Sequence, residues 1–221
     1  MGRSTTWFIK ARTIAGQEEL AAVLIRLMLS INDLSLANAA IEDWNSTTQQ
    51  TRERRKRGAL MYFTRVLLGH VHEALEIVRD ISKSPTLRAA VDRCDKATTS
   101  SYGKLEAFVN SSEVAPLNRL RNRAAFHYDK QLPLRSLAQI ATQASDHSWS
   151  CSMGTHSLDW HFELADAVMD RMVIREVFEL REPRSPERHE KTKMMALRQQ
   201  EIAREFTDFA AHFVRHYSTR R

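Results

Sequence analysis

The sequence contains little cysteine, glycine or proline, and this scarcity narrows the classes of protein that it can encode. Its two cysteines, Cys94 and Cys151, lie far apart and form no Cys-x-x-Cys pair. We therefore predict neither a disulfide framework nor a structural zinc site, and a reducing cytoplasm fits this usage best. Only six glycines and five prolines occur in 221 residues, which favours long, uninterrupted helices.

The motifs of several common enzyme classes are missing as well. No Gly-rich phosphate loop, serine nucleophile elbow or metalloprotease helix motif occurs, which argues against the usual nucleotide-binding and hydrolase classes. The apolar stretch at residues 20–29 contains Arg26 and follows Glu18 and Glu19. A signal peptide or a membrane span would avoid such charges. We expect a cytoplasmic protein with no membrane partner, no cofactor and no bound metal.

The overall composition is that of a folded protein with a basic surface. Hydrophobic residues make up 43% and charged residues 27% of the chain, as in ordinary globular domains. We expect one domain over residues 1–221, and the alternative is that helices at about 158–217 form an appended hairpin. The net charge of +6 favours phosphate-bearing partners, because guanidinium groups bind phosphate bidentately.

Apolar residues recur at spacings of three and four, and this periodicity predicts an all-α fold, a bundle of helices. A first helix is expected over about residues 15–44, with Leu20, Leu24, Leu27, Ile31 and Leu34 on its buried face. The cluster at 45–48 offers hydroxyl caps for a second helix that runs to about residue 82. Because the connector is short, the two helices must pack as an antiparallel hairpin.

Shorter helices and one loop are predicted in the rest of the chain. Ser84-Pro85 starts a third helix, since serine caps a helix and proline suits its first turn. The stretch Thr98–Gly103 is expected to weaken or end it, and Pro133 is expected to end the fourth helix. No strand is predicted. The further helices are expected at about residues 114–130, 134–143, 158–180 and 186–217, with an exposed loop at 144–157.

One nine-residue segment contains an arrangement suited to chemistry. Residues 121–129 read Arg-Asn-Arg-Ala-Ala-Phe-His-Tyr-Asp. An arginine followed after four to six residues by a histidine is expected by chance roughly three times in such a chain, so the bare pattern means little. Its other occurrences end at His70, His72 and His189, and none has Asn after the arginine or an aromatic residue before the histidine.

With the fuller pattern Arg121-Asn122 … His127, the chain resembles the HEPN superfamily of helical proteins. The signature of that family is Arg, usually followed by Asn, and then His. The resemblance implies a helical bundle, usually dimeric, in which paired motifs form a metal-independent RNA-cleaving site. It also implies a toxin–antitoxin, antiviral or stress setting. The partners would be RNA, a second copy of the chain and a protein antitoxin.

The residue types of the motif suit RNA cleavage by the substrate's own 2′-OH. His127 can move protons near neutral pH, and Arg121 would stabilise charge on the phosphate. Asn122 would orient the histidine ring or the phosphate by its amide, and Tyr128 could donate a further hydrogen bond. These four residues are the predicted catalytic set.

The spacing of the motif favours a site shared between two chains. In a straight helix, Arg121 and His127 would lie about 120° apart around the axis and about 9 Å apart along it. Arg123 faces His127 more directly, and a two-fold dimer would bring Arg121 of one chain toward His127 of the other. Phosphate contacts with RNA are predicted for a further set of basic residues: Arg54, Arg55, Arg57, Arg119 and Arg123.

Less specific explanations stay open for each of these features. His127 and Tyr128 could pack between helices, in a non-catalytic HEPN-like dimer that binds nucleic acid or a partner protein, or in a purely structural scaffold. The basic run at 52–57 could be a solvated helix face. His147, Cys151, His156 and His161 lack the spacing of zinc ligands. Exposure of the motif distinguishes the cases, because an enzyme needs His127 and Arg121 facing a solvent-reachable cleft, whereas a scaffold would bury them against apolar neighbours.

Overall fold

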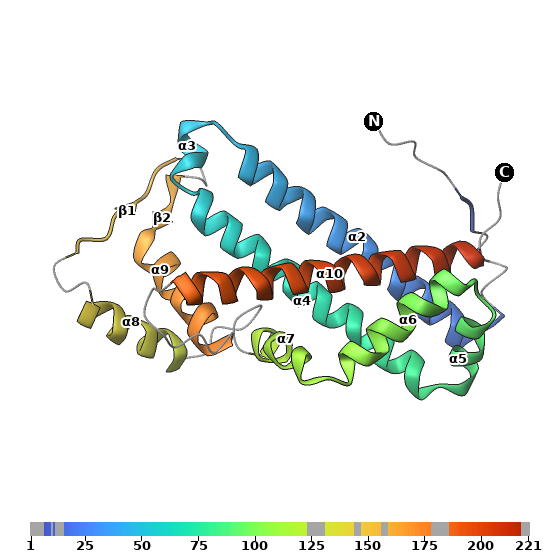
Figure 1. Ribbon diagram of the computed structural model, residues 1–221. Helices are drawn as coiled ribbons and strands as arrows, with labels where there is room; N and C mark the ends of the chain where they lie inside the picture. The colour runs from blue at the N-terminus through green and yellow to red at the C-terminus, as the bar shows by residue number, and fades with distance from the viewer. Residues whose placement is uncertain are drawn as a thin grey trace. The chain divides into compact units, whose positions relative to one another are not determined.

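The chain forms two compact units built almost entirely from helices. The computed structural model describes residues 7–9, 11, 16–122, 131–143, 147–155, 159–177 and 186–217. Unit 1 comprises residues 1–34, 70–114 and 199–221, and unit 2 comprises residues 35–69 and 115–198. In chain order the elements are α2 (Glu18–Ser46), α3 (Gln50–Glu53), α4 (Lys56–Lys83), α5 (Pro85–Asp92), α6 (Lys96–Val109), η1 (Ser112–Val114), α7 (Ala115–Leu120), α8 (Gln131–Gln143), β1 (Cys151–Ser152), β2 (His161–Phe162), α9 (Glu163–Met172), η4 (Val173–Val177) and α10 (Pro186–His216) (Figure 1).

The predicted all-α fold class is confirmed, and so is the antiparallel pairing of the first two long helices. In unit 1, Arg26 of α2 pairs with Asp80 of α4 at 2.7 Å, whereas Asp33 lies 3.6 Å from His70. Residue numbers therefore rise along one helix as they fall along the other. The predicted stripe of α2 is buried at Leu20, Leu24, Leu27 and Leu34, and Ile31 is half-buried.

The core of unit 1 is built from one face each of α2, α4, α6 and α10. Phe206, Phe209 and Phe213 of α10 are at most 1% exposed, because their spacing of three and four places them on one side of the helix. The Phe209 ring lies 5.5 Å from that of Tyr102 and 5.6 Å from that of Phe213, measured between centroids. Burying each phenylalanine stabilises the fold by about 1.5–3 kcal/mol.

The helix caps of unit 1 confirm one predicted boundary and correct another. Ser84 caps α5 by accepting a hydrogen bond from the Leu87 amide at 3.2 Å, as the Ser84-Pro85 pair predicts. The expected end of this helix at Thr98–Gly103 is wrong. Asp95 instead caps a new helix, α6, and accepts hydrogen bonds from the amide and the hydroxyl of Thr98, both at 2.8 Å. These bonds hold the pKa of Asp95 below its usual value.

Unit 2 departs from the predicted boundaries in several places. The second helix is interrupted: α3 has Gln49 as its N-cap, without a side-chain cap, and α4 starts only at Lys56. Pro133 does not end a helix but lies in the first turn of α8, where the missing amide hydrogen costs nothing. The helix expected from residue 158 starts at Glu163, and Phe162 is exposed rather than inward.

A short hairpin occurs where no strand is predicted. β1 and β2 pair antiparallel, with Cys151 opposite Phe162 and Ser152 opposite His161. In the same unit, α8 contacts α9 and α7 contacts η4, and the buried residues of these elements include Leu117, Leu120 and Met172. Of the helix expected at 114–130, α7 covers the first part, and residues 123–130 lie outside the described residues.

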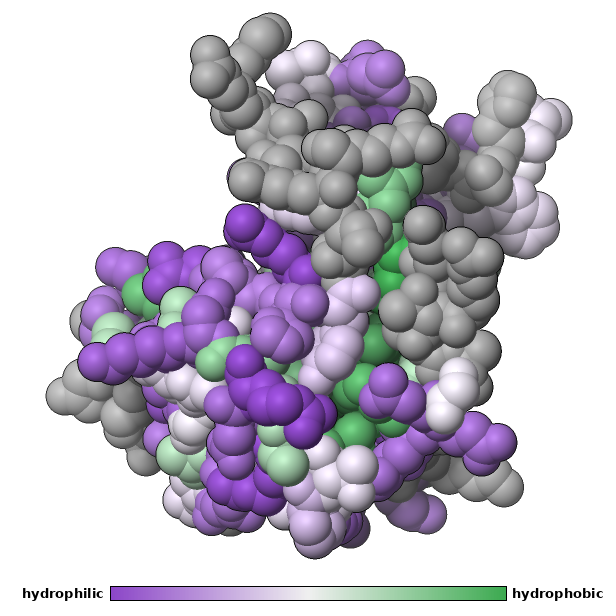
Figure 2. Space-filling model, turned by 90° about the vertical axis from the view of Figure 1, so that its right-hand side faces the viewer, coloured by the Kyte–Doolittle hydropathy of each residue, from purple (hydrophilic) through white to green (hydrophobic). Residues whose placement is uncertain are grey.

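The helix α2 is long and apolar enough to cross a membrane. Its most apolar window of 18 residues has a mean hydropathy of 1.7, and 33% of that window is buried. Its inward face, with Leu24 and Leu27 at 0% exposure, belongs to the core of unit 1. Figure 2 shows mainly hydrophilic residues on the described part of one side of the molecule, with a narrow strip of hydrophobic ones. The cytoplasmic localisation stays a prediction.

Candidate nucleic-acid interface

The first two residues of the HEPN-like motif lie at the surface, directly after α7. This short helix anchors the segment through Leu117 and Leu120, which are at most 1% exposed. Residues 121 and 122 continue from it in a π-helical turn, and both are exposed. Nη1 of Arg121 donates a hydrogen bond of 3.2 Å to Oδ1 of Asn122. The motif thus presents a guanidinium and an amide to solvent from a buried anchor.

The predicted roles of the remaining motif residues cannot be compared with the structure, because most of these residues lie outside its described part. Arg123, His127 and Tyr128 lie outside the described residues. Arg119 is half-buried on α7, just before the exposed pair. The structure therefore brings Arg121 and Asn122 together. The roles expected of His127 and Tyr128 stay predictions.

The basic turn, defined as residues 52–57 where α3 ends and α4 begins, is tied to its surroundings by most of its cations. Arg52 pairs with Asp43 at 2.9 Å, and its guanidinium lies 5.1 Å from the centre of the Trp44 ring. Lys56 lies 3.5 Å from Glu53. The prediction that this run is a phosphate-binding track therefore needs refinement, since a cation held by a carboxylate contributes less charge to a ligand.

Two of the three arginines expected here to contact RNA are also engaged with protein groups. Nη1 of Arg55 donates to the backbone carbonyl of Trp160. Arg57 donates through Nε to Oδ2 of Asp170 at 2.7 Å, and its Nη2 reaches the same oxygen. Arg54 differs from both, because it is exposed and its guanidinium has no hydrogen-bond or ion-pair partner within the described part of the chain. Its guanidinium is therefore available to an external anion.

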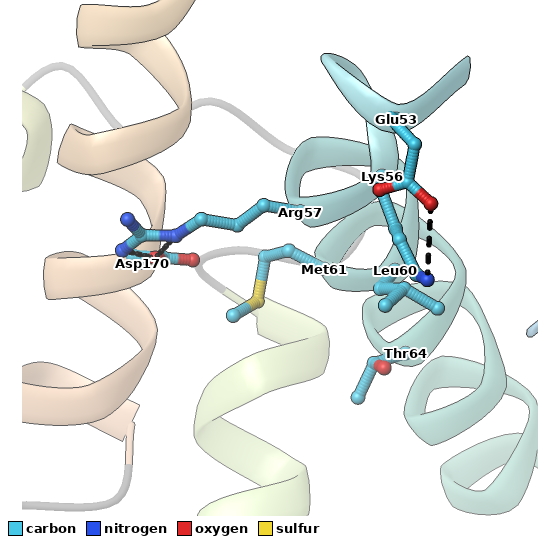
Figure 3. Close-up of a pocket in the computed structure, with 7 residues that line it drawn as sticks. All are labelled: Glu53, Lys56, Arg57, Leu60, Met61, Thr64 and Asp170. Atoms are coloured by element: carbon cyan, nitrogen blue, oxygen red, sulfur yellow. Dashed lines mark hydrogen bonds and ion pairs between the residues drawn. The ribbon is translucent and has the colours of Figure 1, made fainter. Parts of the chain in front are cut away.

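A pocket of about 580 Å³ lies beside the Arg57–Asp170 pair. Figure 3 shows Arg57 reaching from α4 to Asp170 of α9, with Met61 beneath the Arg57 side chain and Leu60 beside Lys56. The carboxylate of Asp170 is largely buried, whereas the Arg57 side chain is mostly exposed. Both cations of this pocket, Arg57 and Lys56, are paired with carboxylates. The pocket is therefore a largely apolar recess with ion pairs at its edge.

The basic turn and the exposed Arg121–Asn122 pair belong to the same unit but not to the same place in it. Both fall within residues 35–69 and 115–198. Figure 1 draws α3 and α7 well apart, at different ends of this unit. An RNA strand that contacts both would have to extend across unit 2, so the two surfaces are separate candidate contact points.

The histidines and the cysteine weighed as metal ligands do not form a metal centre in the described structure. His147 lies against Trp149, with ring centroids 4.5 Å apart, and Cys151 is exposed. His161 faces a carboxylate instead, and His156 lies outside the described residues. Within the described ranges, no three side chains of His, Cys, Asp or Glu gather as a metal site would require.

Comparison with known proteins adds no further identification. No protein-family model, no curated protein and no solved structure matches this chain.

Proposed function

We propose that this chain is a HEPN-like RNA-binding protein that cleaves RNA by attack of the substrate's 2′-OH on the adjacent phosphate, without a metal. The observation that carries the proposal is the exposed, hydrogen-bonded pair Arg121–Asn122, which begins the segment that resembles the HEPN motif. An arginine that binds phosphate must reach solvent, and Arg121 meets this requirement.

The chemistry divides between the two ends of the motif. Arg121 stabilises the negative charge that develops on the phosphate, and its bond to Asn122 limits the orientations of the guanidinium. His127 transfers the proton from the 2′-OH or to the leaving oxygen. Because one motif supplies few groups, a second copy of the chain completes the site in a two-fold dimer. A toxin–antitoxin, antiviral or stress setting with a protein antitoxin follows from the family resemblance alone.

Cleavage of single-stranded RNA in the presence of EDTA tests this proposal. We expect products with 2′,3′-cyclic phosphate ends. His127→Ala and Arg121→Ala should each slow cleavage about 100-fold or more, if acid–base and electrostatic catalysis have their usual sizes. His70→Ala is the matched control, because it completes a chance Arg-to-His spacing on α4 and lies 3.6 Å from Asp33. It should cut at the wild-type rate.

Three results bear on the alternatives. If both motif variants stay folded by thermal melting and cut as fast as wild type, the catalytic assignment is wrong. If wild type binds RNA but cuts none, the protein is a non-catalytic HEPN-like binding module. A monomer in sedimentation at micromolar concentration would contradict the shared site.

A further inference from the structure

A second pocket in unit 2, the hairpin pocket, lies between the basic turn and the β1–β2 hairpin. It has a volume of about 380 Å³. Its two walls are tied together where Arg55 donates to the carbonyl of Trp160. The residues that line it are Gln50, Arg54, Arg55, Ser152, Met153, Gly154, Asp159 and His161.

The hairpin wall is held in place by hydrogen bonds on both sides of the strands. The Ser152 hydroxyl donates to the carbonyl of Asp159 at 2.8 Å, and the Trp160 indole donates to the carbonyl of Gly154 at 2.9 Å. Glu163 then accepts from the amide and the hydroxyl of Ser150, at 3.1 and 2.9 Å. These two bonds lower the pKa of Glu163, so its carboxylate stays ionised. His161 therefore lies on an ordered element.

The ring of His161 is oriented by a carboxylate behind it. Nε2 of His161 lies 3.1 Å from Oδ2 of Asp166, and the two side chains are 14% and 31% exposed. Gly58 makes room for this pair, because a Cβ there would lie 2.1 Å from Oδ2 of Asp166. A carboxylate that holds one ring nitrogen fixes the ring and leaves the other nitrogen for a ligand. Arrangements of this kind position histidines in binding sites.

The charges around the pocket favour an anion. Arg54 has no protein partner among the described residues, and Nε of Arg55 is buried with no hydrogen-bond partner within them. Asp159 is the carboxylate that lines the same pocket. The guanidinium of Arg54 can bind two oxygens of a phosphate at once, and the His161 ring in its doubly protonated form can donate to the phosphate through Nδ1 while Nε2 donates to Asp166.

Exposed aromatic rings flank His161 and favour a ligand that carries bases. Trp160 is 50% and Phe162 is 48% exposed, although large apolar side chains usually pack inward. Trp160 directly precedes His161 in the chain and Phe162 directly follows it, although neither ring is part of the pocket lining. Proteins that bind single strands commonly combine a basic groove with such rings, on which bases stack.

We propose that the hairpin pocket binds a backbone phosphate of single-stranded RNA, with Arg54 and His161 as its contacts. Asp166 is a positioning residue that acts through His161, and Gly58 provides the space for it. The proposal rests on the proposed function only for the identity of the ligand, which is RNA. It adds a contact point remote from Arg121, so that the strand is held at two places on unit 2.

Fluorescence anisotropy with a labelled single-stranded RNA tests the pocket directly. His127→Ala protein is used in EDTA so that the RNA stays intact. In this background Arg54→Gln should weaken binding about tenfold and lower the salt dependence by about one counterion. Arg52→Gln is the matched control: it removes the same charge from the same turn, but Arg52 pairs with Asp43 and lies outside the pocket. It should bind RNA within about twofold of the parent.

If Asp166 positions His161, removing its carboxylate should change RNA affinity in the direction opposite to that expected from charge repulsion alone. Removing a carboxylate near RNA should strengthen binding, because repulsion falls. Asp166→Asn should nevertheless weaken binding, since a neutral amide holds the doubly protonated His161 ring less strongly than a carboxylate does, and His161→Ala should weaken it similarly. Asp159→Asn, which removes the other carboxylate of the pocket, should bind as tightly as the parent or more tightly. Thermal melting confirms that each variant is folded.

The outcomes separate this proposal from the cleavage proposal. If folded Arg54→Gln and His161→Ala bind RNA like the parent, or if no RNA binds at all, the hairpin pocket is not an RNA site. Tighter binding by Asp166→Asn would remove the positioning role. If a labelled mononucleotide binds as tightly as the RNA, the pocket is a nucleotide site instead. Wild type that binds RNA through Arg54 but cuts none contradicts only the cleavage proposal.

Discussion

The two units differ in how many apolar residues they bury and in how their arginines are used. Most of the buried hydrophobic residues described belong to unit 1, where Phe206, Phe209 and Phe213 are buried, as are the apolar faces of α2 and α4. In unit 2 the buried positions are fewer, and arginines such as Arg55 and Arg57 reach across to distant segments. Unit 1 therefore holds most of the buried apolar packing, and unit 2 holds the surfaces that we propose for RNA binding.

Unit 1 also has an open pocket, and its chemistry illustrates the difference. Arg93, His212 and His216 help to line a space of about 510 Å³ that also contains Cys94 and Asp95. Burial raises the pKa of the Cys94 thiol to about 11, so the thiol stays protonated and unreactive near neutral pH. Asp95 is already occupied as the cap of α6. The groups of this pocket serve the fold, whereas Arg54 in unit 2 is not used by it.

The largest effect is expected from a deletion in the core of unit 1. Phe209→Ala removes a ring with 0% exposure and should lower the free energy of unfolding by about 3–5 kcal/mol, through lost burial and the cavity that remains. Urea denaturation measures this loss. Leu29→Ala on α2, where the side chain is 56% exposed, is the control and should change stability by less than about 0.5 kcal/mol. Similar losses from both would contradict the assignment of the core.

A pair of glycine substitutions should act with opposite signs in the two units. A Cβ on Gly103, in α6 of unit 1, meets nothing within 4 Å, so Gly103→Ala should stabilise the protein by about 0.5–1 kcal/mol through helix propensity. Gly58→Ala forces Asp166 from its place and should destabilise by about 1 kcal/mol, because overpacking outweighs the same helical gain. Thermal melting distinguishes the two. A stabilising Gly58→Ala would show that Asp166 moves without cost.

The difference between the packed unit 1 and the more polar unit 2 also explains which elements can be predicted from the sequence. The helices α2, α4 and α10 follow from apolar spacing, since one long face of each is buried. The cap at Ser84-Pro85 is predictable because its signal is local. The Asp95 cap with Thr98 is an equally local signal. The prediction that Thr98–Gly103 ends a helix misses this cap. Pro133 shows the limit of a residue rule, because a proline is allowed in a first turn and forbidden later.

The candidate site is harder to predict because its parts meet through tertiary contacts. The sequence identifies Arg121 and Asn122 by their order, and the structure places both at the surface. The sequence gives no reason to join His161 and Asp166 with Arg54. The Asp166 carboxylate lies against Gly58, more than a hundred positions earlier in the chain. Likewise, nothing local shows that Arg54 alone of its neighbours lacks a partner among the described residues.

The smallest expected effect is the loss of folding stability in acid. One carboxylate in each unit allows the two units to be compared. Hydrogen bonds from Thr98 lower the pKa of Asp95 in unit 1, and hydrogen bonds from Ser150 lower that of Glu163 in unit 2. A carboxylate whose folded-state pKa is lowered contributes stability above its unfolded-state pKa. It loses that contribution as the pH falls through the folded-state value. Both bonds should therefore weaken below about pH 4.

Asp95→Asn and Glu163→Gln separate the two contributions, because each amide keeps an acceptor oxygen but no longer titrates. Denaturation midpoints measured from about pH 6 to about pH 3 should fall for wild type and fall less steeply for each variant. Both carboxylates are solvent-accessible, so the change per variant should be small and should shrink in high salt.

Because Asp95 caps a helix of the packed core while Glu163 ties down a surface hairpin, Asp95→Asn should flatten the global unfolding profile more. Glu163→Gln should instead act chiefly on hydrogen exchange of the hairpin amides. If Glu163→Gln flattens the global profile as much as Asp95→Asn does, the hairpin unfolds together with the core, and the division between a stabilising and a binding unit does not hold.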